Sequence, residues 1–401
     1  MRISTLQIHN QGAQAIIDRQ RESSRTQLQL STGHKLVSPS DDPVGSARLL
    51  TVQEQIATNE QYQRNITLAN SRLGLEENAL QGTGDLLQRA HELAVAGNNA
   101  PLSDADRGSI AQEVRQMLAQ LQDLANSRDS NGEFIFSGFK TQTQPFTGAA
   151  DGNVSYRGDQ GQRRLQVGLQ QTIAVGDPGD DVFQRIRTGN GKFQVATTAT
   201  NTGSGTVAVG SVIDPTVFQA HNYRIQFTAA DQYDVIDDTT GTPVLAGQTY
   251  SDGQAISFSG IETAVSGAPA AGDSFTIQPS ANQDLFTTLG NLATALEAPT
   301  ATVAQRAQVH QAMANSLADL DQGLDHLLEV RGRVGVRLNV LQSQEQNNED
   351  FNLRLEKILN DVDGLDYAEA STNLNQELLA LQAAQQSFVR INSLSLFNYL
   401  R

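Results

Sequence analysis

Hydrophobic residues recur every three or four positions in both ends of the chain, and every second position in much of its middle. The first spacing indicates helices that bury one face, and the second indicates half-buried strands. Proline is absent from 1–38, from 44–100 and after Pro299, which leaves three long windows open to helix. The pattern therefore predicts two helical halves with a β-rich segment inserted between them.

Two long helices are predicted in the first half. The first covers 44–98 and ends at turn signals, with apolar positions at Leu49, Val52, Ile56, Leu68, Leu75, Leu80, Leu86 and Leu87. The second follows Ser103, which can form a capping box with Asp106. It carries one apolar stripe of Ile110, Val114, Met117, Leu118, Leu121 and Leu124. A single stripe on each helix indicates packing against other helices.

After Asn131 and Gly132, apolar residues recur at every second position. The segment GEFIFSGFKTQTQPF (132–146) therefore predicts a strand followed by a hairpin. Two further short strands are predicted on either side of 158–161. From about 183 to 280, short alternating runs separated by turn residues predict an antiparallel β-domain.

The helical spacing returns after Asp284. One helix carries Leu285, Leu289, Leu292 and Leu296 and ends at Pro299. The next shows a coiled-coil seam at Leu317, Leu320, Leu324, Leu327, Val330, Val334, Leu338 and Leu341. A final stripe starts at Leu374 and runs almost to the end of the chain.

The stripes at the two ends are thin and lie in polar surroundings. The first contains Ile3, Leu6, Ala13, Ile17 and Leu28, and the last contains Leu374, Leu378, Leu381, Phe388, Ile391, Leu394 and Phe397. Each buries too little surface to offset the conformational entropy of an isolated chain. We therefore expect the ends to be marginal alone and to order by packing on each other and on neighbouring subunits.

The segment 30–49, LSTGHKLVSPSDDPVGSARL, separates the first helix from the second. Gly33 and Pro39 are expected to end the first helix. Asp42, preceded by Asp41, suits an N-cap with Pro43 in the first turn of the next helix. The segment is interpreted as a joint, with residues before about 40 disordered in the free monomer and helical in an assembly.

Composition excludes several kinds of protein. The 401 residues carry a formal charge of −16, which argues against nucleic acid as a partner. The absence of cysteine excludes disulfides, thiolate zinc sites and cysteine nucleophiles. No apolar run is long enough to span a bilayer, and the N-terminus lacks the apolar core of a signal peptide.

The sequence has no phosphate-binding, nucleophile-elbow, zinc-protease or dinucleotide motif, and no two histidines stand at metal-ligand spacing. Three acidic runs resemble calcium loops, but their glycine or glutamate positions are wrong, so we interpret them as caps and turns. They start at Asp104, Asp129 and Asp361. The enzymatic alternative is a glycan-active site in the β-domain that uses the acids Asp231, Asp234, Asp237 and Asp238. Solvated turn acids are the simpler explanation.

Several strings resemble the flagellin superfamily. They are the segment 30–49, LLQRAHELAVAGNNAPLSDADRGSIAQEVRQMLAQLQDLAN (86–126), GEFIFSGFKTQTQPF, VRGRVGVRLNVL (330–341) and LDYAEASTNLNQELLALQAAQQSFVRINSLSLFNYL (365–400). FSGFKT and SLFNYL are closer to the proteins of the hook–filament junction than to flagellin. The insertion is a weaker match, although VSGAPAAGDSFTIQP (265–279) resembles a module of hook-associated proteins.

The resemblance implies a mainly α fold with inserted β, arranged as a flagellin-like layered rod. Residues 1–45 and 350–401 are expected to form an inner antiparallel coiled coil of the terminal helices. Residues 46–175 and 283–349 are expected to form a helical middle domain with a β-hairpin near 132–146, and 176–282 an outer antiparallel β-domain.

It also implies a structural adaptor, without enzymatic activity or cofactor, that joins hook-associated protein 1 to the flagellin filament. The alternative is flagellin itself, the filament subunit. Expected partners are these two proteins, further copies of the chain in a ring, and an export chaperone on the C-terminal helix, with no nucleic acid and no membrane insertion. The expected location is the extracellular flagellum, reached through the flagellar type III apparatus without a cleaved signal. The stripes at the two ends would pack between subunits, and the middle domain would make contacts through Arg89, Glu92, Leu93, Phe134, Phe136 and Phe139.

Overall fold

The computed structural model describes residues 5–99, 102–148 and 153–393. The chain divides into two compact units, one of Met1–Asn65 with Ser343–Arg401 and one of Ile66–Gln342. The helices are α1 (Thr5–Thr32), α2 (Pro43–Gly97), α3 (Asp104–Ala125), α4 (Gly179–Phe183), α5 (Leu285–Glu297), α6 (Val303–Asp363) and α7 (Tyr367–Ser393). Helices α2 and α6 each contribute residues to both units. The mainly helical fold with a central antiparallel β-domain is confirmed.

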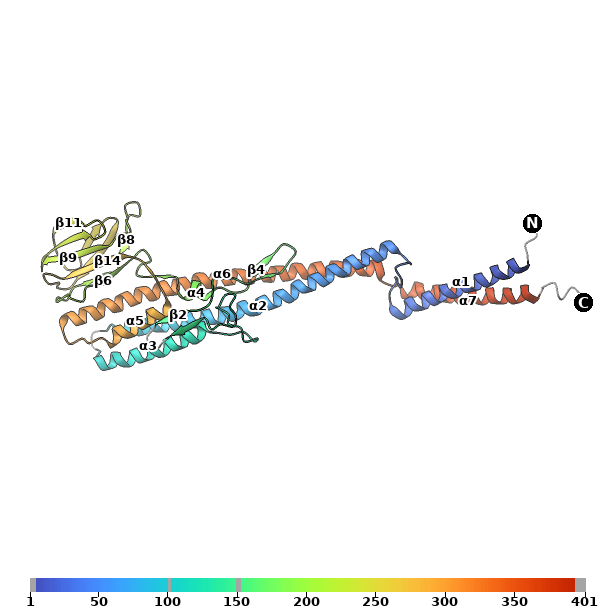
Figure 1. The fold of residues 1–401 in the computed structure, drawn as a ribbon, viewed down its shortest axis with the longest axis horizontal. Coiled ribbons are helices and arrows are strands. Elements are labelled where there is room, and N and C mark those ends of the chain that lie inside the picture. The colour runs from blue at the N-terminus through green and yellow to red at the C-terminus, as the bar shows by residue number, and fades with distance from the viewer. Residues whose placement is uncertain (1–4, 100–101, 149–152, 394–401) are drawn as a thin grey trace, which may run out of the picture. The chain divides into compact units, whose positions relative to one another are not determined.

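In the first unit the terminal helices α1 and α7 lie side by side and antiparallel (Figure 1). Near one end of the pair, the His9 ring meets the Phe388 ring edge-on at 5.6 Å. Near the other end, Thr26 donates a hydrogen bond to Glu377 at 3.0 Å. The start of α2 pairs with the end of α6, where the Asn59 amide donates to the Asn348 carbonyl at 2.7 Å.

In the second unit, two seven-residue repeats form the centre of the helical core. Helix α2 buries Ile66, Leu73, Leu80 and Leu87, and α6 buries Leu320, Leu327, Val334 and Leu341. A seven-residue apolar repeat keeps one face of a helix on its partner, so the coiled-coil seam of α6 is confirmed. On α2 the predicted apolar positions are confirmed in part: Val52, Leu80, Leu86 and Leu87 are buried, but Leu68 is exposed and Leu75 only half-buried.

Helix α3 packs on the short, almost fully buried α5. The Ser103–Asp106 capping box of α3 is present as predicted, and Asp284 caps α5 by accepting a bond from the Thr287 amide at 2.7 Å. At the other end of α5, Arg115 of α3 forms two bonds of 2.8 and 2.7 Å to Glu297.

Small β-elements and an aromatic cluster close one side of this core. The pairs are β1 (Phe146–Gly148) with β2 (Val154–Tyr156) and β3 (Arg164–Gln166) with β4 (Thr172–Ala174). The rings of Phe136, Phe146, Phe183 and Phe286 lie 5.0–6.2 Å from their neighbours in the cluster. They supply the buried aromatic surface that the first hundred residues lack.

The strand and hairpin predicted over 132–146 are wrong. The segment consists of turns with a single bridge between Arg128 and Phe134, and the first hairpin strand begins only at Phe146. The alternation does bury Phe134 and Phe136. However, the Phe134 amide bonds back to the Thr141 carbonyl at 2.8 Å, so the backbone closes on itself instead of extending.

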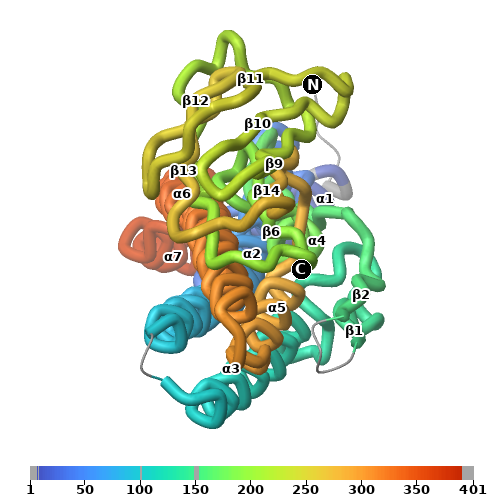
Figure 2. Tube along the Cα trace, turned by 90° about the vertical axis from the view of Figure 1, so that its left-hand side faces the viewer, coloured from blue at the N-terminus to red at the C-terminus, as the bar shows by residue number. Residues whose placement is uncertain are grey.

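The β-domain contains two antiparallel sheets around one core (Figure 2). The five-stranded sheet has the order β11-β10-β9-β14-β6, from β6 (Phe193–Thr197), β9 (Tyr223–Ala229), β10 (Gln232–Asp237), β11 (Thr242–Thr249) and β14 (Ser274–Pro279). The other contains β7 (Thr206–Val207), β8 (Ser211–Val212), β12 (Ala255–Phe258) and β13 (Ile261–Ser266). The antiparallel β-domain predicted from about 183 to 280 is confirmed.

The chain enters and leaves the β-domain through two paired strands, β5 (Ile186–Arg187) and β15 (Asn282–Gln283). We refer to this pair as the neck. β15 lies at the predicted limit of 282, but α4 separates β5 from the predicted limit at 176. The exact domain boundaries given above stay predictions. The two compact units divide within α2, after Asn65, and within α6, after Gln342.

Candidate functional site

The predicted joint is held by the turn between α6 and α7. The Asp363 carboxylate lies 2.6 Å from His34 Nδ1 and accepts a bond from the Leu36 amide at 2.9 Å. The Asp363 carbonyl accepts a further bond from the Lys35 amide at 2.8 Å. Three consecutive residues after α1 are thus bound to one residue at the end of α6, a pairing that no local pattern in the sequence indicates.

Gly33 ends α1, as predicted. It has a φ of +75°, a conformation that suits glycine at the end of a helix, and its amide donates to the Gln29 carbonyl at 2.8 Å. A Cβ at this position would stand 2.7 Å from the hydroxyl of Tyr367, the first residue of α7. A larger residue here would therefore have to displace the Tyr367 side chain.

The two acids of the joint have separate structural roles. Asp41 closes the turn that contains Pro39, since its side chain accepts a bond from the Ser38 amide at 3.0 Å. Asp42 is the N-cap of α2 and accepts bonds from the amides of Val44 at 3.1 Å and Gly45 at 2.9 Å. Pro43 is the first residue of α2. The predicted cap is confirmed; the function of the segment as a joint between domains stays a prediction.

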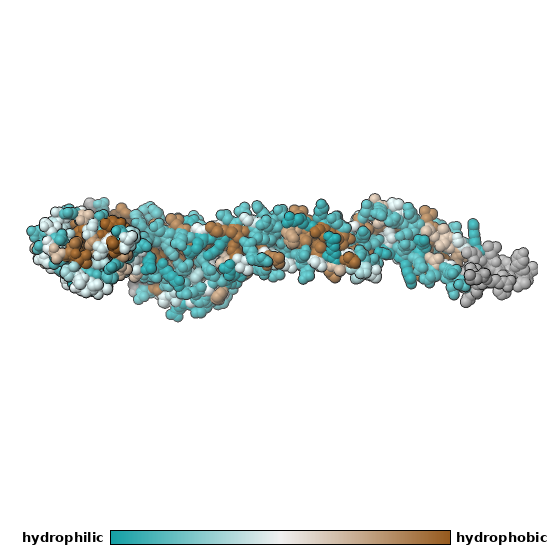
Figure 3. All heavy atoms as spheres, turned by 90° about the horizontal axis from the view of Figure 1, so that it is seen from above, coloured by the Kyte–Doolittle hydropathy of each residue, from teal (hydrophilic) through white to brown (hydrophobic). Residues whose placement is uncertain are grey.

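The terminal helices leave apolar side chains uncovered. Ile17 and Leu28 on α1 are 43% and 47% exposed, and Leu378 on α7 is 48% exposed. On the inner side of the pair, Leu374, Leu381 and Phe388 are half-buried. Figure 3 shows that the visible face of the helices is mostly hydrophilic, with apolar residues scattered over it. The predicted positions Ile3, Leu394 and Phe397, and the side chains of Leu6 and Ile391, lie outside the described part of the chain.

The middle-domain residues differ in accessibility. Arg89 and Glu92 are on the surface of α2, where Arg89 pairs with Glu92 and with Glu113 of α3, each at 3.1 Å. Leu93, Phe134 and Phe136 are buried, so they support the fold and do not offer a free surface. Phe139 is 63% exposed and is the one aromatic of this set that a partner can reach directly.

A buried ion network connects α2 to the turn after α3 and was not predicted. Arg72 is 7% exposed and lies 2.8 Å from Asp129 and 2.5 Å from Glu133. Arg163 also pairs with Glu133, at 2.7 Å, and these contacts lower the pKa of the Glu133 carboxyl. The signal available in the sequence was an arginine within the apolar stripe of α2.

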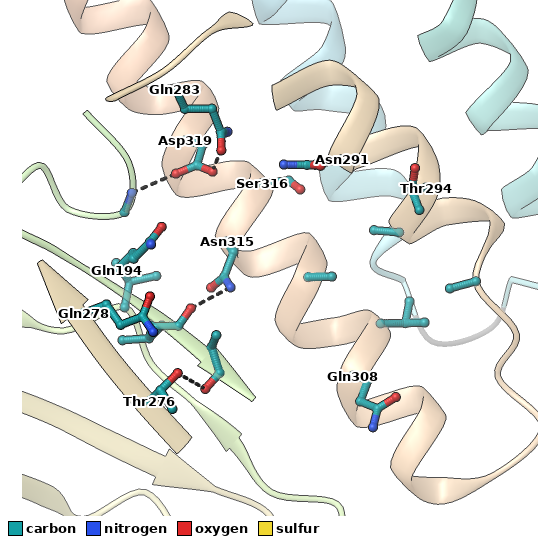
Figure 4. A pocket seen from close by; sticks show the side chains of 18 of the residues that line it. Gln194, Thr276, Gln278, Gln283, Asn291, Thr294, Gln308, Asn315, Ser316 and Asp319 are labelled. Atoms are coloured by element: carbon teal, nitrogen blue, oxygen red, sulfur yellow. Dashed lines mark hydrogen bonds between the residues drawn. The ribbon is translucent and has the colours of Figure 1, made fainter. Parts of the chain in front are cut away.

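A cleft of about 580 Å³ lies between the five-stranded sheet and helices α5 and α6 (Figure 4). Asn315 on α6 lines the cleft and donates to the Val195 carbonyl at 2.8 Å. Gln311, also on α6, accepts from the Val207 amide at 2.8 Å. Asp319 accepts from the Gly189 amide at 2.7 Å, and its burial raises the pKa of its carboxyl. Of these contacts, the one from Asn315 reaches β6, so α6 covers part of the outer edge of this edge strand.

The four acids proposed for a glycan-active site do not face one cleft as a pair. Asp234 accepts a bond from the Gly247 amide at 2.6 Å, and Asp238 pairs with Arg224 at 2.9 Å. Asp237 is buried and accepts from His221 and from the amides of Thr239 and Thr240. Asp231 precedes β10, Asp234 and Asp237 lie in β10, and Asp238 follows it. The explanation as solvated turn acids does not hold for Asp237, which is buried in the strand.

The acids of the three calcium-like runs are also explained by caps and ion pairs. Asp106 caps α3, Asp129 belongs to the Arg72 network and Asp363 to the joint. Over residues 5–99, 102–148 and 153–393, no group of three or more potential ligands is placed to hold a metal ion. None of the described helices has a stretch long and apolar enough to cross a membrane.

Comparison with known proteins agrees with this arrangement. Residues 3–141 match the family model of the bacterial flagellin N-terminal helical region. The crystal structure of flagellar hook-associated protein 3 from Legionella pneumophila is 35% identical, with a TM-score of 0.74 over 78% of this chain and 98% of that chain. The chain belongs to the flagellar hook-associated protein 3 family.

Other members of the hook-associated protein 3 family give the same result. The Escherichia coli protein is 26% identical over 398 residues, which cover 99% of both chains. The Xanthomonas campestris structure is 35% identical, with a TM-score of 0.72 over 77% of this chain and 99% of that chain. Residues 196–279 match the D2-like domain of flagellar hook-associated protein 1. The family is structural, so the prediction of a flagellar protein that is not an enzyme is confirmed.

Proposed function

We propose that the chain is a junction protein that joins hook-associated protein 1, on the hook side, to the flagellin filament. The observation that supports this most directly is the full-length similarity to hook-associated protein 3, which favours a junction protein over flagellin, the alternative left open by the sequence. The mainly helical ends and the inserted β-domain suit an adaptor that needs several distinct surfaces.

The terminal helices would make the contacts between subunits. Ile17, Leu28 and Leu378 are exposed on the α1–α7 pair, and burial of such side chains against neighbours is favourable by about 25 cal/mol per Å² of apolar surface. In the proposed junction, copies of the chain form a ring in which these faces are covered. An export chaperone on the C-terminal helix would cover Leu378 before assembly.

Deletion of the gene tests the adaptor function. We expect mutant cells to keep their hooks but to release unassembled flagellin into the medium, with motility restored by the intact gene. Immunogold labelling of intact flagella should mark only the base of the filament. Normal filaments on the deletion strain, or label along the whole filament, would refute the proposal and favour a filament subunit.

Cysteine cross-linking tests the contacts of the terminal helices. Because the sequence has no cysteine, Ile17→Cys, Leu28→Cys and Leu378→Cys each introduce a single thiol. We expect intersubunit disulfides among these variants in assembled flagella and none in the secreted monomer. Leu169→Cys, on an exposed turn between β3 and β4, is the matched control and should remain uncross-linked.

A further inference from the structure

Two adjacent glutamates on α2 have opposite surroundings. Glu77 is partly exposed and pairs with Arg331 of α6 at 2.6 Å. Glu76 is 2% exposed, and its Oε2 has no hydrogen-bond partner among the described residues. A buried carboxylate without a counter-charge is unfavourable, whereas its neutral form is tolerated.

The contacts of Glu76 lead to the segment 175–181, which follows β4 and includes the first residues of α4. Its Oε1 accepts a bond from the Asp177 amide at 3.0 Å. Asp177 is itself buried, but its carboxylate is bound by Arg337 of α6, through bonds of 2.8 and 3.0 Å, and by the Gln162 amide at 2.7 Å. The segment is therefore bound to both long helices.

The charged side chains around Glu76 are already paired with one another and leave no free cation for it in the described part of the chain. Arg337 pairs with Asp177, and Arg333 of α6 pairs with Asp181 at 2.8 Å. On its own helix, one turn away, Arg72 is engaged by Asp129 and Glu133. An ionised Glu76 would therefore add an uncompensated charge beside the Asp177 carboxylate.

We propose that Glu76 is a proton-dependent clasp: its protonated form holds the segment 175–181 against helices α2 and α6, and its ionised form releases it. With the proton on Glu76, the segment is closed against the helices. Loss of the proton places two carboxylates side by side in a buried site and favours the open segment. Burial, and after it the negative charge of Asp177, raise the pKa of Glu76 to about 8, which agrees with the geometry.

The clasp connects protonation to the aromatic core. The segment continues into α4, which contributes the fully buried Phe183 to the cluster with Phe136, Phe146 and Phe286. Opening of the segment would therefore loosen the packing between the small hairpins and the helices. The proposal does not depend on the partners of the chain in the flagellum.

Amide hydrogen exchange of the full-length protein tests the clasp. After correction for intrinsic exchange, the opening constant of 175–181 should rise about tenfold per pH unit between pH 5.5 and 7.5 and level off above about pH 8, because opening releases one proton. Glu76→Gln should abolish the rise. Glu77→Gln should keep it, and so should His326→Gln, which removes the ring that contacts the Asp181 carbonyl at 2.7 Å.

An unchanged slope in Glu76→Gln, or a flat profile in the natural sequence, would overturn the proposal. If Glu76→Gln fails to fold, infrared spectroscopy of the unmodified protein decides. A protonated carboxylic-acid band present at pH 7 and lost at high pH supports the clasp, and the absence of that band at pH 7 refutes it.

Discussion

His34 Nδ1 lies 2.6 Å from a carboxylate oxygen of Asp363, although 329 positions separate the two residues in the chain. The same carboxylate accepts the Leu36 amide, so one buried acid fixes the backbone where α1 ends. The joint is therefore a tertiary structure built from both ends of the chain and not only a turn.

Replacement of this acid should loosen the joint. Asp363→Ala leaves the Leu36 amide without its acceptor, and loss of a partner for a buried polar group costs about 1–3 kcal/mol. We expect faster amide exchange at Leu36 and a lower thermal midpoint. Asp361→Ala, which removes an exposed acid two residues earlier, is the control and should change neither. Equal effects of the two variants would contradict the assigned role of Asp363.

Gly33→Ala should destabilise the same region for two separable reasons. The left-handed conformation costs a non-glycine residue about 1–2 kcal/mol, and the new Cβ would meet the Tyr367 hydroxyl. Combining the substitution with Tyr367→Phe removes the hydroxyl only. We expect thermal unfolding to show a partial recovery in the double variant; complete recovery would mean that backbone strain is negligible here.

Arg72→Met should be among the most damaging single substitutions in the helical core. It leaves Asp129 and Glu133 without their buried cation, and breaking such a pair costs about 3–5 kcal/mol. Arg64→Met, on the same helix, removes an exposed pair with Glu60 and should cost less than about 1 kcal/mol. Chemical unfolding gives the loss of unfolding free energy in each variant. Similar losses in the two would argue that the Arg72 network does not stabilise the helical core.

The same network predicts an acid-sensitive stability. The hydrogen bond from Arg163, together with the charges of Arg163 and Arg72, lowers the pKa of Glu133 below its ordinary value of 4.5. A lowered pKa contributes stability that is present above pH 4.5 and is lost as the pH falls through the lower value. Unfolding measured from pH 6 to pH 3 should therefore show a smaller acid-induced loss in Arg163→Met than in the unmodified protein.

Gln311 should be essential for holding the β-domain on α6. It is 2% exposed and accepts the buried Val207 amide, so Gln311→Leu leaves that amide unpaired at a cost of about 1–3 kcal/mol. We expect faster exchange at Val207. Gln308→Leu, one turn earlier on the same helix face, removes an exposed bond to the Ala199 carbonyl and should have little effect at Val207.

Helix periodicity predicted most of the fold, because burial of one face imposes a regular spacing that local sequence carries. The apolar seam of α6 and the apolar residues of α5 follow this spacing. The cap of α3 was predicted from its own local motif, Ser103 with Asp106. The buried positions of α2 were predicted only in part, since its apolar residues occupy more than one face and only the partner helix decides which face is buried. Leu68 and Ile66 illustrate this: both are apolar, but only Ile66 is covered.

The remaining errors have local and long-range causes. The segment FIFSGF (134–139) alternates like a strand, but Gly132 and Gly138 both have positive φ and turn the backbone back on itself. Two other features depend on residues far away in the sequence: the pairing of Asp363 with His34, and the burial of Glu76 with no hydrogen-bond partner for its Oε2 among the described residues. The subunit contacts of the terminal helices stay predictions, because the apolar positions show that a partner is needed but not which one.

The neck has an evolutionary consequence. Because β5 and β15 pair with each other, the β-domain begins and ends at almost the same point, and its exchange for another module need not shift the helices on either side. The separate family matches of 3–141 and 196–279 fit such a history of replacement. The neck is therefore a natural position for grafting foreign domains with adjacent termini, which would turn the protein into a display scaffold.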